Sequence, residues 1–430
     1  MGLGRDIVYG IGAVATSPIW GLSLLRTGKW RTDWAGRFGD TAGRGLGEKR
    51  DGVKRLLIHG VSVGEVNLIR NLVAELNAVD AVEVVVATTT NTGFARASAL
   101  YGKDSGGHAV VRFPFDFSGG VKKFLDAVRP DAVALVELEV WPNFVEACNR
   151  RGVPVAVVNG RLTERSYRGY RRLGPLIRGA FRGLTVAGVQ TEDYAERFVG
   201  VGVPAERVKV LDTMKWDTAV VEDTVDGAGA LAEAMGIDRG RPLVVAGSTA
   251  PGEERLLIEA APRDAQLLIA PRKPEWFEGV VRMAKELGRG VVRRTAPDST
   301  TVDTDNPPVF LLDTIGELRA AYSLADVCVV GRSFTGELYG SDMMEPIALG
   351  KPTVIGPYYA DFAETMRALE DAGGIVVTDD PASAIDELLR NRTMASEVAA
   401  AGREVIRSRQ GATRRYRDLL LGLLGVAAVE

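Results

Sequence analysis

Short apolar runs alternate with amphipathic, helix-like segments along most of this chain, and that alternation constrains its fold more than any other feature. In the first half, the apolar runs expected to form buried strands are residues 56–58, 83–88, 132–138, 153–158 and 184–189. The helical patterns between them are residues 66–77, 94–100, 120–128, 144–151 and 191–199. Strands that alternate with helices predict a parallel, doubly wound sheet.

A second series of the same kind starts after residues 220–241, a stretch rich in Gly, Ala and Asp that is typical of a domain junction. Its expected strands are residues 243–246, 267–269, 291–293, 309–312, 327–330, 353–355 and 375–377. Its expected helices are residues 253–261, 276–287, 318–323 and 362–372. Two Rossmann-like α/β lobes joined by a short linker describe the GT-B fold of nucleotide-sugar enzymes, which bind ligands at the carboxyl ends of both sheets.

These patterns divide the 430 residues into four parts. We expect an N-terminal segment at residues 1–30, a first lobe at 31–218, a second lobe at 219–410 and a C-terminal helix at 411–430. The final helical stretch, residues 382–424, is expected to cross back to the first lobe.

The N-terminal segment is unusually apolar, with no charged residue between Asp6 and Arg26. Its length is near the lower limit for a membrane-spanning helix, but three glycines and Pro18 weaken a straight span. Basic residues and Trp30 follow at once, as they do at the cytoplasmic face of a membrane. We expect an apolar membrane-associating helix, with spanning and interfacial placements both open. The alternative is an amphipathic helix packed on the domain.

Charge and composition exclude two other classes of partner. The formal net charge of −3 gives no case for nucleic acid as a partner. His59 and His108 are the only histidines, and no spacing of histidines or of the two cysteines is typical of a zinc site. We therefore expect no metal site.

Candidate catalytic carboxylates follow two strands of the first lobe. Glu65 ends the motif HGVSVGE (residues 59–65) and opens the helix at 66–77, where the helix dipole favours negative charge. A carboxylate in that place can act as a general base on a hydroxyl. Alternatively, it caps the helix and has no chemical role, and the spacing alone favours this second interpretation. Glu137 and Glu139 follow another strand; a hydrolase would use such a pair, whereas a single Glu there would cap the next helix.

Other polar residues of the first lobe could contact a polyol or an anion. A hydroxyl-rich loop, TTTNTG, follows the strand at 83–88 and includes Thr89 and Thr90. A basic run with interleaved tyrosines begins at Arg161 and Arg165 and continues to residue 182. Such a run is usually a solvated helix face, but here it could meet anionic lipid headgroups or a phosphorylated acceptor.

In the second lobe, small or charged residues follow several expected strands. They are Ser248 in the loop GST, Arg272 and Lys273 in PRKP, Gly316 with Glu317 and Leu318 in DTIGEL, Ser333 in GRS, and Glu345 before GKP. Small residues let the backbone approach a phosphate, and arginine binds phosphate in a bidentate manner. Each feature alone is more often structural, but all of them at strand ends of one lobe indicate a nucleotide site.

Together these motifs resemble the Kdo transferases of lipopolysaccharide assembly, which transfer 3-deoxy-D-manno-octulosonic acid (Kdo) to the lipid A precursor. The motifs that match, in the family's order, are GKWRTDWAGRFG, HGVSVGE, TTTNTG, ELEVWPN, NGRLTERSYRGY, DTMKWD, GST, PRKPEWF, DTIGELRAAY, GRS, EPIALGKP and GPYYADF. The ordered set covers nearly the whole chain and is specific, although each motif alone is not.

The resemblance implies a metal-independent, inverting glycosyltransferase without a cofactor, bound to the inner membrane at its cytoplasmic face. It would move Kdo from CMP-Kdo to a hydroxyl of the phosphorylated lipid A precursor. The first lobe would bind the acceptor and the second lobe the CMP-sugar donor.

The resemblance also gives roles to single residues. Glu65 becomes the general base, Arg272 holds the CMP phosphate, and Glu345 binds the ribose. The other donor-binding residues would be Lys215, near the donor carboxylate, with Ser248, Lys273, Gly316, Glu317, Leu318 and Ser333. The acceptor-binding residues would be Ser62, Gly64, Thr89, Thr90, Glu139, Arg161 and Arg165.

Three positions depart from the family pattern, because histidines usual there are replaced. Ala250 follows GST, Lys273 follows Pro-Arg, and residues 340–344 read GSDMM before Glu345. Two alternatives therefore stay open. One is a related GT-B enzyme with a different nucleotide sugar, which with a diphosphate donor would need a second anion site. The other is a degenerate, membrane-tethered binding protein, which the retained Glu65 and Arg272 argue against.

Overall fold

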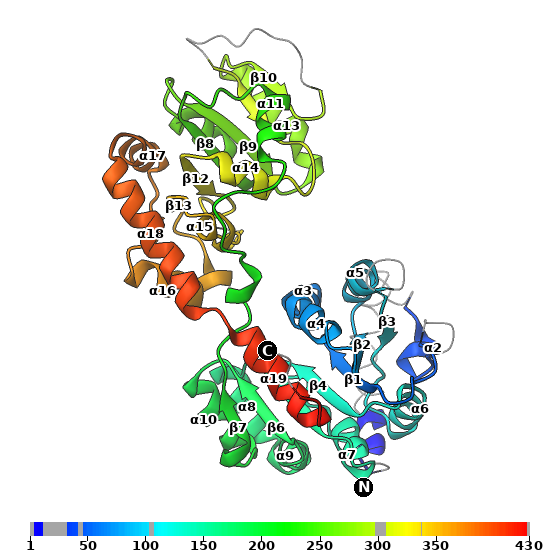
Figure 1. The fold of residues 1–430 in the computed structure, drawn as a ribbon. Helices are drawn as coiled ribbons and strands as arrows, with labels where there is room; N and C mark the ends of the chain where they lie inside the picture. Colours follow the sequence, from blue (N-terminus) through cyan, green and yellow to red (C-terminus); the bar gives the residue numbers. More distant parts are fainter. Residues whose placement is uncertain are drawn as a thin grey trace. The chain divides into compact units, whose positions relative to one another are not determined.

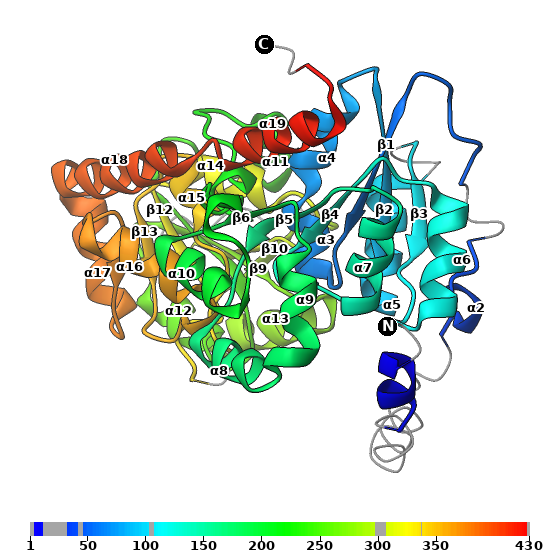
Figure 2. The ribbon, with the colours of Figure 1, turned by 90° about the horizontal axis from the view of Figure 1, so that it is seen from below.

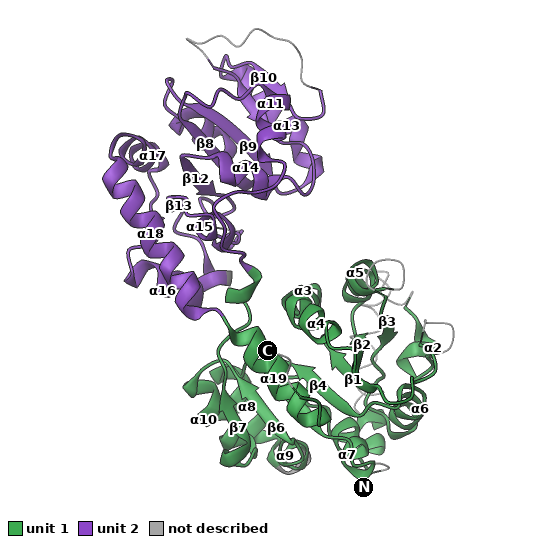
Figure 3. Ribbon diagram, viewed as in Figure 1, with its two compact units in different colours: residues 1–218, 411–430 green, residues 219–410 purple. Residues whose placement is uncertain are grey.

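The computed structural model describes residues 4–11, 32–41, 46–102, 107–296, 307–336 and 338–427. The chain divides into two compact units, coloured separately in Figure 3. Unit 1 comprises residues 1–218 and 411–430, and unit 2 comprises residues 219–410. The C-terminal segment therefore belongs to the same unit as the N-terminal half.

The described part of unit 1 is built on a parallel sheet with strand order β3-β2-β1-β4-β5-β6-β7. The strands are β1 (Lys54–His59), β2 (Val82–Thr88), β3 (Ala109–Arg112), β4 (Ala132–Val136), β5 (Val155–Gly160), β6 (Val186–Val189) and β7 (Val208–Val210). Leu57 of β1 pairs with Val85 on one side and with Val133 on the other. The order reverses between β1 and β4, and open α/β sheets bind ligands beyond the carboxyl ends of the strands at such a point.

Helices cover both faces of this sheet (Figure 1). One face packs against α6 (Ser118–Val128), α7 (Pro142–Arg150), α9 (Gly174–Arg182) and α10 (Glu192–Val201). The other packs against α3 (Val63–Leu68), α4 (Arg70–Asn77), α5 (Asn91–Tyr101) and α19 (Ala412–Leu424). Two further α-helices of this unit are α2 (Trp34–Arg37) and α8 (Glu164–Arg172). Because both faces are covered, β4 is buried along its whole length, which explains its unbroken apolar sequence.

Unit 2 repeats the architecture, with strand order β10-β11-β9-β8-β12-β13-β14, again parallel. The strands are β8 (Leu243–Thr249), β9 (Gln266–Pro271), β10 (Val291–Arg293), β11 (Val309–Leu311), β12 (Val327–Val330), β13 (Thr353–Ile355) and β14 (Val376–Val377). The helices are α11 (Ala228–Met235), α12 (Glu254–Ala260), α13 (Phe277–Glu286), α14 (Leu318–Leu324), α15 (Met344–Ala348), α16 (Ala363–Asp371), α17 (Pro381–Arg390) and α18 (Arg392–Arg409). The two parallel-sheet α/β lobes predicted from the sequence are confirmed.

Several elements differ from the sequence prediction. The short strands β3 and β7 were not expected, and the predicted junction at 220–241 contains helix α11. The helix expected at 66–77 is interrupted at Ile69. The helical stretch expected at 382–424 consists of three helices, because Asn391 caps α18 and Gly411, with φ of +101°, precedes α19.

The predicted membrane segment lies largely outside the described residues, since residues 12–31 are not described. Residues 4–11 are helical, and three of their side chains make polar contacts with the first lobe. Arg5 pairs with Glu146 (2.5 Å), Asp6 accepts from the Ser118 main chain (3.0 Å), and Tyr9 donates to Asp116 (3.1 Å). No helix among the described residues has the length and apolar character needed to cross a bilayer.

Helix α19 is fixed to unit 1 by Tyr416, which is fully buried. Figure 2 shows α19 beside α4, in agreement with their shared core. The Tyr416 hydroxyl donates to the Asp212 carbonyl (3.1 Å), and its ring lies so close to Gly188 of β6 that a Cβ there would be 2.6 Å from Cε1. The ring therefore fills a space that no smaller side chain would fill.

We predict that Tyr416→Ala lowers the free energy of unfolding of the full chain by about 3–5 kcal/mol, because it removes a fully buried ring. Tyr416→Phe keeps the ring and should cost only about 1 kcal/mol, for the lost hydrogen bond. Urea unfolding followed by circular dichroism measures both values. Equal losses in the two variants would contradict this account of the ring.

Candidate functional site

The loop after β1 holds Glu65 through reciprocal hydrogen bonds. Ser62 caps α3, and its hydroxyl accepts from the Glu65 main-chain N–H (3.4 Å). In return, Glu65 Oε2 accepts from the Val61 N–H (2.8 Å) and Oε1 accepts from the Ser62 hydroxyl (2.9 Å). This arrangement is a variant of the capping box in which Glu65 accepts from the residue before the N-cap, and it fixes the orientation of the carboxylate. The capping role that the sequence suggested is thus present. Because the Glu65 carboxylate is partly exposed, capping does not prevent it from acting as a base.

The surroundings of Glu65 favour a proton on its carboxyl. Burial raises the pKa of Glu65, the nearby charge of Glu139 raises it further, and the hydrogen bonds from Val61 and Ser62 lower it. A carboxyl with a raised pKa is a stronger base once ionised. Gly64 beside it faces open space, where an added Cβ would meet only Ser62 Oγ, at 3.7 Å.

Glu137 is a second acid of this group, which the sequence singled out only as one of a pair of carboxylates with Glu139. It follows β4 with a φ of +57°, a left-handed conformation that is rare outside glycine. Burial raises the pKa of Glu137, the charge of Glu65 raises it further, and Arg161 and Lys215 lower it. These four charged side chains therefore interact near the carboxyl ends of β4 and β5. Lys215, expected to bind the donor, belongs to unit 1.

Glu139 lies beside the buried His59. Its Oε2 accepts from Trp141 Nε1 (2.8 Å) and lies 3.8 Å from His59 Nε2. The His59 ring stacks on Phe113 with centroids 3.6 Å apart, and Nδ1 lies 3.1 Å from the Ala87 carbonyl oxygen. This contact leaves Nε2 directed toward Glu139.

Buried polar atoms without hydrogen bonds gather at the same edge of the sheet. They are His59 Nε2, Thr88 Oγ1 and Asn159 Nδ2, at the ends of β1, β2 and β5. Asn159 also has a positive φ, of +53°. Unsatisfied polar groups are uncommon in folded proteins, so these three atoms at the strand ends are candidates to contact a ligand. The sequence signal for Asn159 was its place at the start of the motif NGRLTERSYRGY.

Several of the remaining candidate acceptor-binding residues already make hydrogen bonds within unit 1. The Thr90 hydroxyl caps α5 by accepting from the Gly93 N–H (3.0 Å) and donates to the Val61 carbonyl (2.9 Å). The Thr89 carbonyl accepts weakly from Arg112 (3.4 Å). Arg161 follows β5, with Nε 3.4 Å from the Tyr194 hydroxyl, and Arg165 lies exposed on α8. Arg161 is therefore closer to the acidic group than Arg165, which faces solvent.

In unit 2, Glu253 joins two of the loops that carry donor candidates. Its fully buried carboxylate accepts from the main-chain N–H groups of Ala250 (2.9 Å), Arg332 (2.5 Å) and Phe334 (3.4 Å). Ser248 in the first loop and Arg332 in the second have φ values of +57° and +60°. Gly331 is required, since a Cβ there would lie 2.6 Å from Glu253 Oε1. Glu253 was missed as a site residue; its only sequence signal was the pair Glu253-Glu254 after GST.

The donor candidates differ in how available their side chains are. Arg272 follows β9, is exposed and makes no side-chain hydrogen bond or ion pair with a described residue. Lys273 lies over the Trp276 ring (4.9 Å) and near Glu275 (3.6 Å). The Ser333 hydroxyl is buried, donates to the Val330 carbonyl (2.6 Å) and accepts from the Gly356 N–H (2.9 Å). Arg272 is thus available to a ligand, whereas Ser333 shapes its loop.

The other donor candidates lie after β11 and at α15. Gly316 is exposed with a φ of +98°, and the Glu317 carboxylate accepts from Arg294 (3.0 Å) and from Thr314. Leu318 begins α14 and packs partly against the core. Burial raises the pKa of Glu345 in the first turn of α15, and the charge of Arg319 lowers it. Among the described residues, no three His, Cys, Asp or Glu side chains group as metal ligands would.

Residues 32–218 match the sequence profile of the family described as 3-deoxy-D-manno-octulosonic-acid transferase (kdotransferase). A 3-deoxy-D-manno-octulosonic acid transferase of Bordetella pertussis is 31% identical over 98% of this chain and 100% of its own length. Among solved structures, a glycosyltransferase from Rickettsia africae aligns with a TM-score of 0.57 at 11% identity, over 87% of this chain and 100% of the other. A UDP-GlcNAc 2-epimerase from Neisseria meningitidis aligns with a TM-score of 0.56 at 13% identity, over 86% of this chain and 100% of the other. These two structures show a GT-B-like fold and nothing finer.

Glu254, next to Glu253, generates a prediction on stability. Burial raises the pKa of Glu254 to about 7, although the Thr249 hydroxyl hydrogen-bonds to it (3.1 Å). Because the pKa of Glu254 is higher in the folded than in the unfolded state, its ionisation destabilises the fold. The stability that the neutral carboxyl contributes is complete below about pH 4.5 and is lost as the pH rises through about 7. Glu254→Gln should therefore match the wild type near pH 4.5 and be more stable at pH 8, by at most about 3 kcal/mol.

Urea unfolding between pH 4.5 and 8 measures this difference. Glu259→Gln, at a more exposed position of the same helix (54% exposed), should change stability by less than about 0.5 kcal/mol at every pH. A constant difference between Glu254→Gln and the wild type across this range would contradict the raised pKa.

Proposed function

Because this chain belongs to the 3-deoxy-D-manno-octulosonic acid (Kdo) transferase family and is a glycosyltransferase, we propose that it transfers Kdo from CMP-Kdo to a hydroxyl of a phosphorylated lipid A precursor. The observation that carries this proposal is the oriented, partly buried Glu65 within the acidic group at the end of β1 and β4. A hydroxyl acceptor needs such a base, because an alcohol is a weak nucleophile until its proton is removed.

The proposed mechanism is a single displacement with inversion. The ionised Glu65 takes the proton of the acceptor hydroxyl while its oxygen forms a bond to the anomeric carbon of Kdo. The bond between that carbon and the CMP oxygen breaks, and CMP leaves with the electron pair. The Val61 N–H and the Ser62 hydroxyl hold Glu65 in one orientation throughout.

Side chains of unit 2 would stabilise the departing CMP. Arg272 would neutralise charge on its phosphate, and the main-chain N–H groups of the loops joined by Glu253 would support it. Glu345 would accept hydrogen bonds from the ribose hydroxyls. Lys215 and Arg161, close to Glu137, would offset the negative charge of the acidic group and bind the carboxylate or phosphate groups of the substrates.

We also propose that unit 1 binds the cytoplasmic face of the inner membrane. Ile7, Val8 and Ile11 are exposed on the N-terminal helix (56%, 49% and 65%), beside the polar contacts that dock it. Phe115, next to Asp116 in sequence, contacts the exposed rings of Trp34 and Phe38. Exposed apolar and aromatic side chains of this kind are typical of proteins that lie at a lipid interface.

The decisive experiment measures CMP release from CMP-Kdo, with and without the lipid A precursor in detergent. Release that depends on the acceptor, with a gain of one or more Kdo masses on the lipid, supports the proposal. Tight CMP binding without release would favour the binding protein instead, and release from another CMP-linked acidic sugar would favour a different donor at the altered positions Ala250, Lys273 and Asp342.

We predict that Glu65→Gln lowers kcat by about 10²–10⁴-fold and leaves CMP affinity unchanged, because it removes only the base. The wild-type rate should rise with pH through the raised pKa of Glu65, since the base acts when ionised. Glu75→Gln on α4, which pairs with Arg417 (3.4 Å), is the matched control and should retain activity. Full activity of Glu65→Gln would disprove the assignment of the base.

Arg272→Ala should raise the KM for CMP-Kdo about 10–100-fold, the loss expected for a hydrogen bond to a charged group. Arg282→Ala on the neighbouring helix α13 removes an exposed arginine outside the site and should change KM little. Steady-state kinetics with varied donor measures both values, and an unchanged KM in Arg272→Ala would exclude the phosphate contact.

A further inference from the structure

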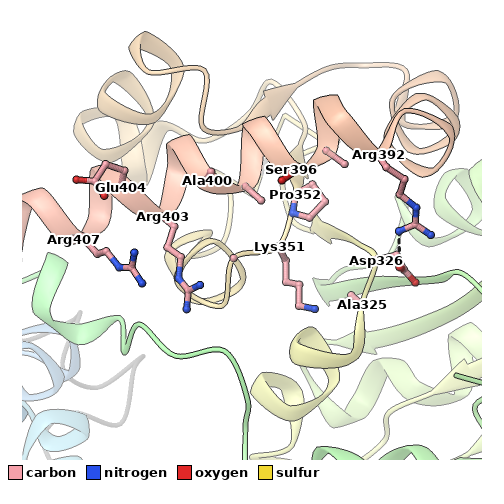
Figure 4. Close-up of a pocket in the computed structure, with 13 residues that line it drawn as sticks. Ala325, Asp326, Lys351, Pro352, Arg392, Ser396, Ala400, Arg403, Glu404 and Arg407 are labelled. Carbon is pink, nitrogen blue, oxygen red and sulfur yellow. Dashed lines mark hydrogen bonds and ion pairs between the residues drawn. The ribbon is translucent and has the colours of Figure 1, made fainter.

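A pocket of about 660 Å³ opens on unit 2, between α18 and the loops before β12 and β13. Figure 4 shows the side chains that line it. Asp326 precedes β12 and Lys351 precedes β13, so the pocket lies at the amino ends of these strands. The donor candidates Ser248, Arg272 and Ser333 instead lie at or just beyond carboxyl ends. The pocket is therefore separate from the proposed donor site.

The lining of this pocket is basic. Lys351, Arg392, Arg403 and Arg407 contribute four cations, and Asp326 and Glu404 contribute two carboxylates, an excess of two positive charges. In Figure 4 the side chains of Lys351, Arg403 and Arg407 extend from the lower side of α18 and the adjacent loop. A concave basic surface of this kind attracts anions.

Lys351 lacks a direct counter-ion. Its ammonium forms no hydrogen bond or ion pair with any residue that the structure describes. The carboxylate of Asp326 is already engaged, since Oδ1 pairs with Arg392 (2.8 Å) and Oδ2 accepts from the Leu243 N–H (3.0 Å). Partial burial also lowers the pKa of Lys351. An unpaired, half-buried ammonium is unfavourable, and a bound anion would relieve the cost.

Arg403 is held against the same loop but is only partly satisfied. Its Nη1 would lie 3.2 Å from a Cβ at Gly350, the residue before Lys351. Nη1 pairs with Asp223 (2.6 Å), while the buried Nε has no hydrogen-bond partner. Asp223 is 84% exposed, and the charge of Arg407 also acts on it. The exposed Asp223 carboxylate thus pairs with Arg403 at a position where a more highly charged anion could replace it.

We propose that this pocket binds a soluble phosphate monoester or diphosphate through Lys351, Arg403 and Arg407, with Asp223 displaced from Arg403. Phosphate suits these residues because arginine binds it in a bidentate manner and several cations can share its charge. A lipid surface fits less well. The apolar part of the wall consists of Pro352, Ala325 and alanines of α18, and no exposed large hydrophobic side chain of the described residues lines it.

The test is isothermal titration of the full chain in detergent with inorganic pyrophosphate. Lys351→Ala and Arg403→Ala should each weaken binding about tenfold or more. Arg407→Ala, at an exposed position, should weaken it severalfold. Arg390→Ala, an exposed arginine of α17 that pairs with Asp386, is the matched control and should leave affinity unchanged. Circular dichroism verifies that each variant is folded.

A second pair of variants separates this site from others. Arg272→Ala should retain the pyrophosphate site, and Asp223→Ala should tighten binding severalfold because it removes the competing carboxylate. The proposal is overturned if binding persists in the Lys351, Arg403 and Arg407 variants, if it is lost in Arg272→Ala, or if Asp223→Ala binds no more tightly. Loss of binding to phosphatidylglycerol vesicles in Lys351→Ala, with pyrophosphate binding unchanged, would overturn it in favour of a lipid surface.

Discussion

Parallel strands buried on both faces can present polar side chains only where the strands end, and both candidate sites depend on this constraint. β4 is buried along its whole length, yet Glu137 follows it directly. Glu137, Asn159, Ser248 and Arg332 all have positive φ values close to strand ends. A left-handed conformation costs roughly 1–2 kcal/mol for a residue with a Cβ. Glycine would avoid that cost. The presence of a larger side chain at each of these positions therefore indicates that the side chain itself has a function.

Carboxylates organise the loops in both units, but in different ways. Glu253 is fully enclosed and accepts main-chain N–H groups from two loops, so its role is to hold the backbone. Glu65 makes comparable contacts within one loop but stays partly exposed. Capping and catalysis are therefore compatible for Glu65, because the hydrogen bonds that cap the helix also direct the carboxylate. The difference in exposure separates a purely structural acid from one that can meet a substrate.

The sequence predicted the two sheets well because buried parallel strands are short, continuous apolar runs. It missed β3 and β7, the two edge strands of the first sheet, where Arg112 and Lys209 interrupt the apolar pattern. It also missed the break at Ile69 within an otherwise continuous helical pattern. Among site residues, sequence patterns singled out Glu65 and Arg272, which lie in motifs at strand ends. The roles of Glu137, Asn159 and Glu253 depend on burial and backbone conformation, which spacing along the chain does not encode.

The three departures from the family pattern leave the described framework of the donor loops in place. The Ala250 N–H still donates to Glu253, which also holds the loop after β12. The Lys273 ammonium packs over the Trp276 ring, and Asp342 accepts from the Met344 N–H (2.9 Å) at the start of α15. The loops are thus shaped by main-chain hydrogen bonds and by Glu253. Because main-chain groups and Glu253 make the hydrogen bonds that join these loops, substitutions at Ala250, Lys273 and Asp342 are compatible with an intact loop framework, as expected for a member of a transferase family.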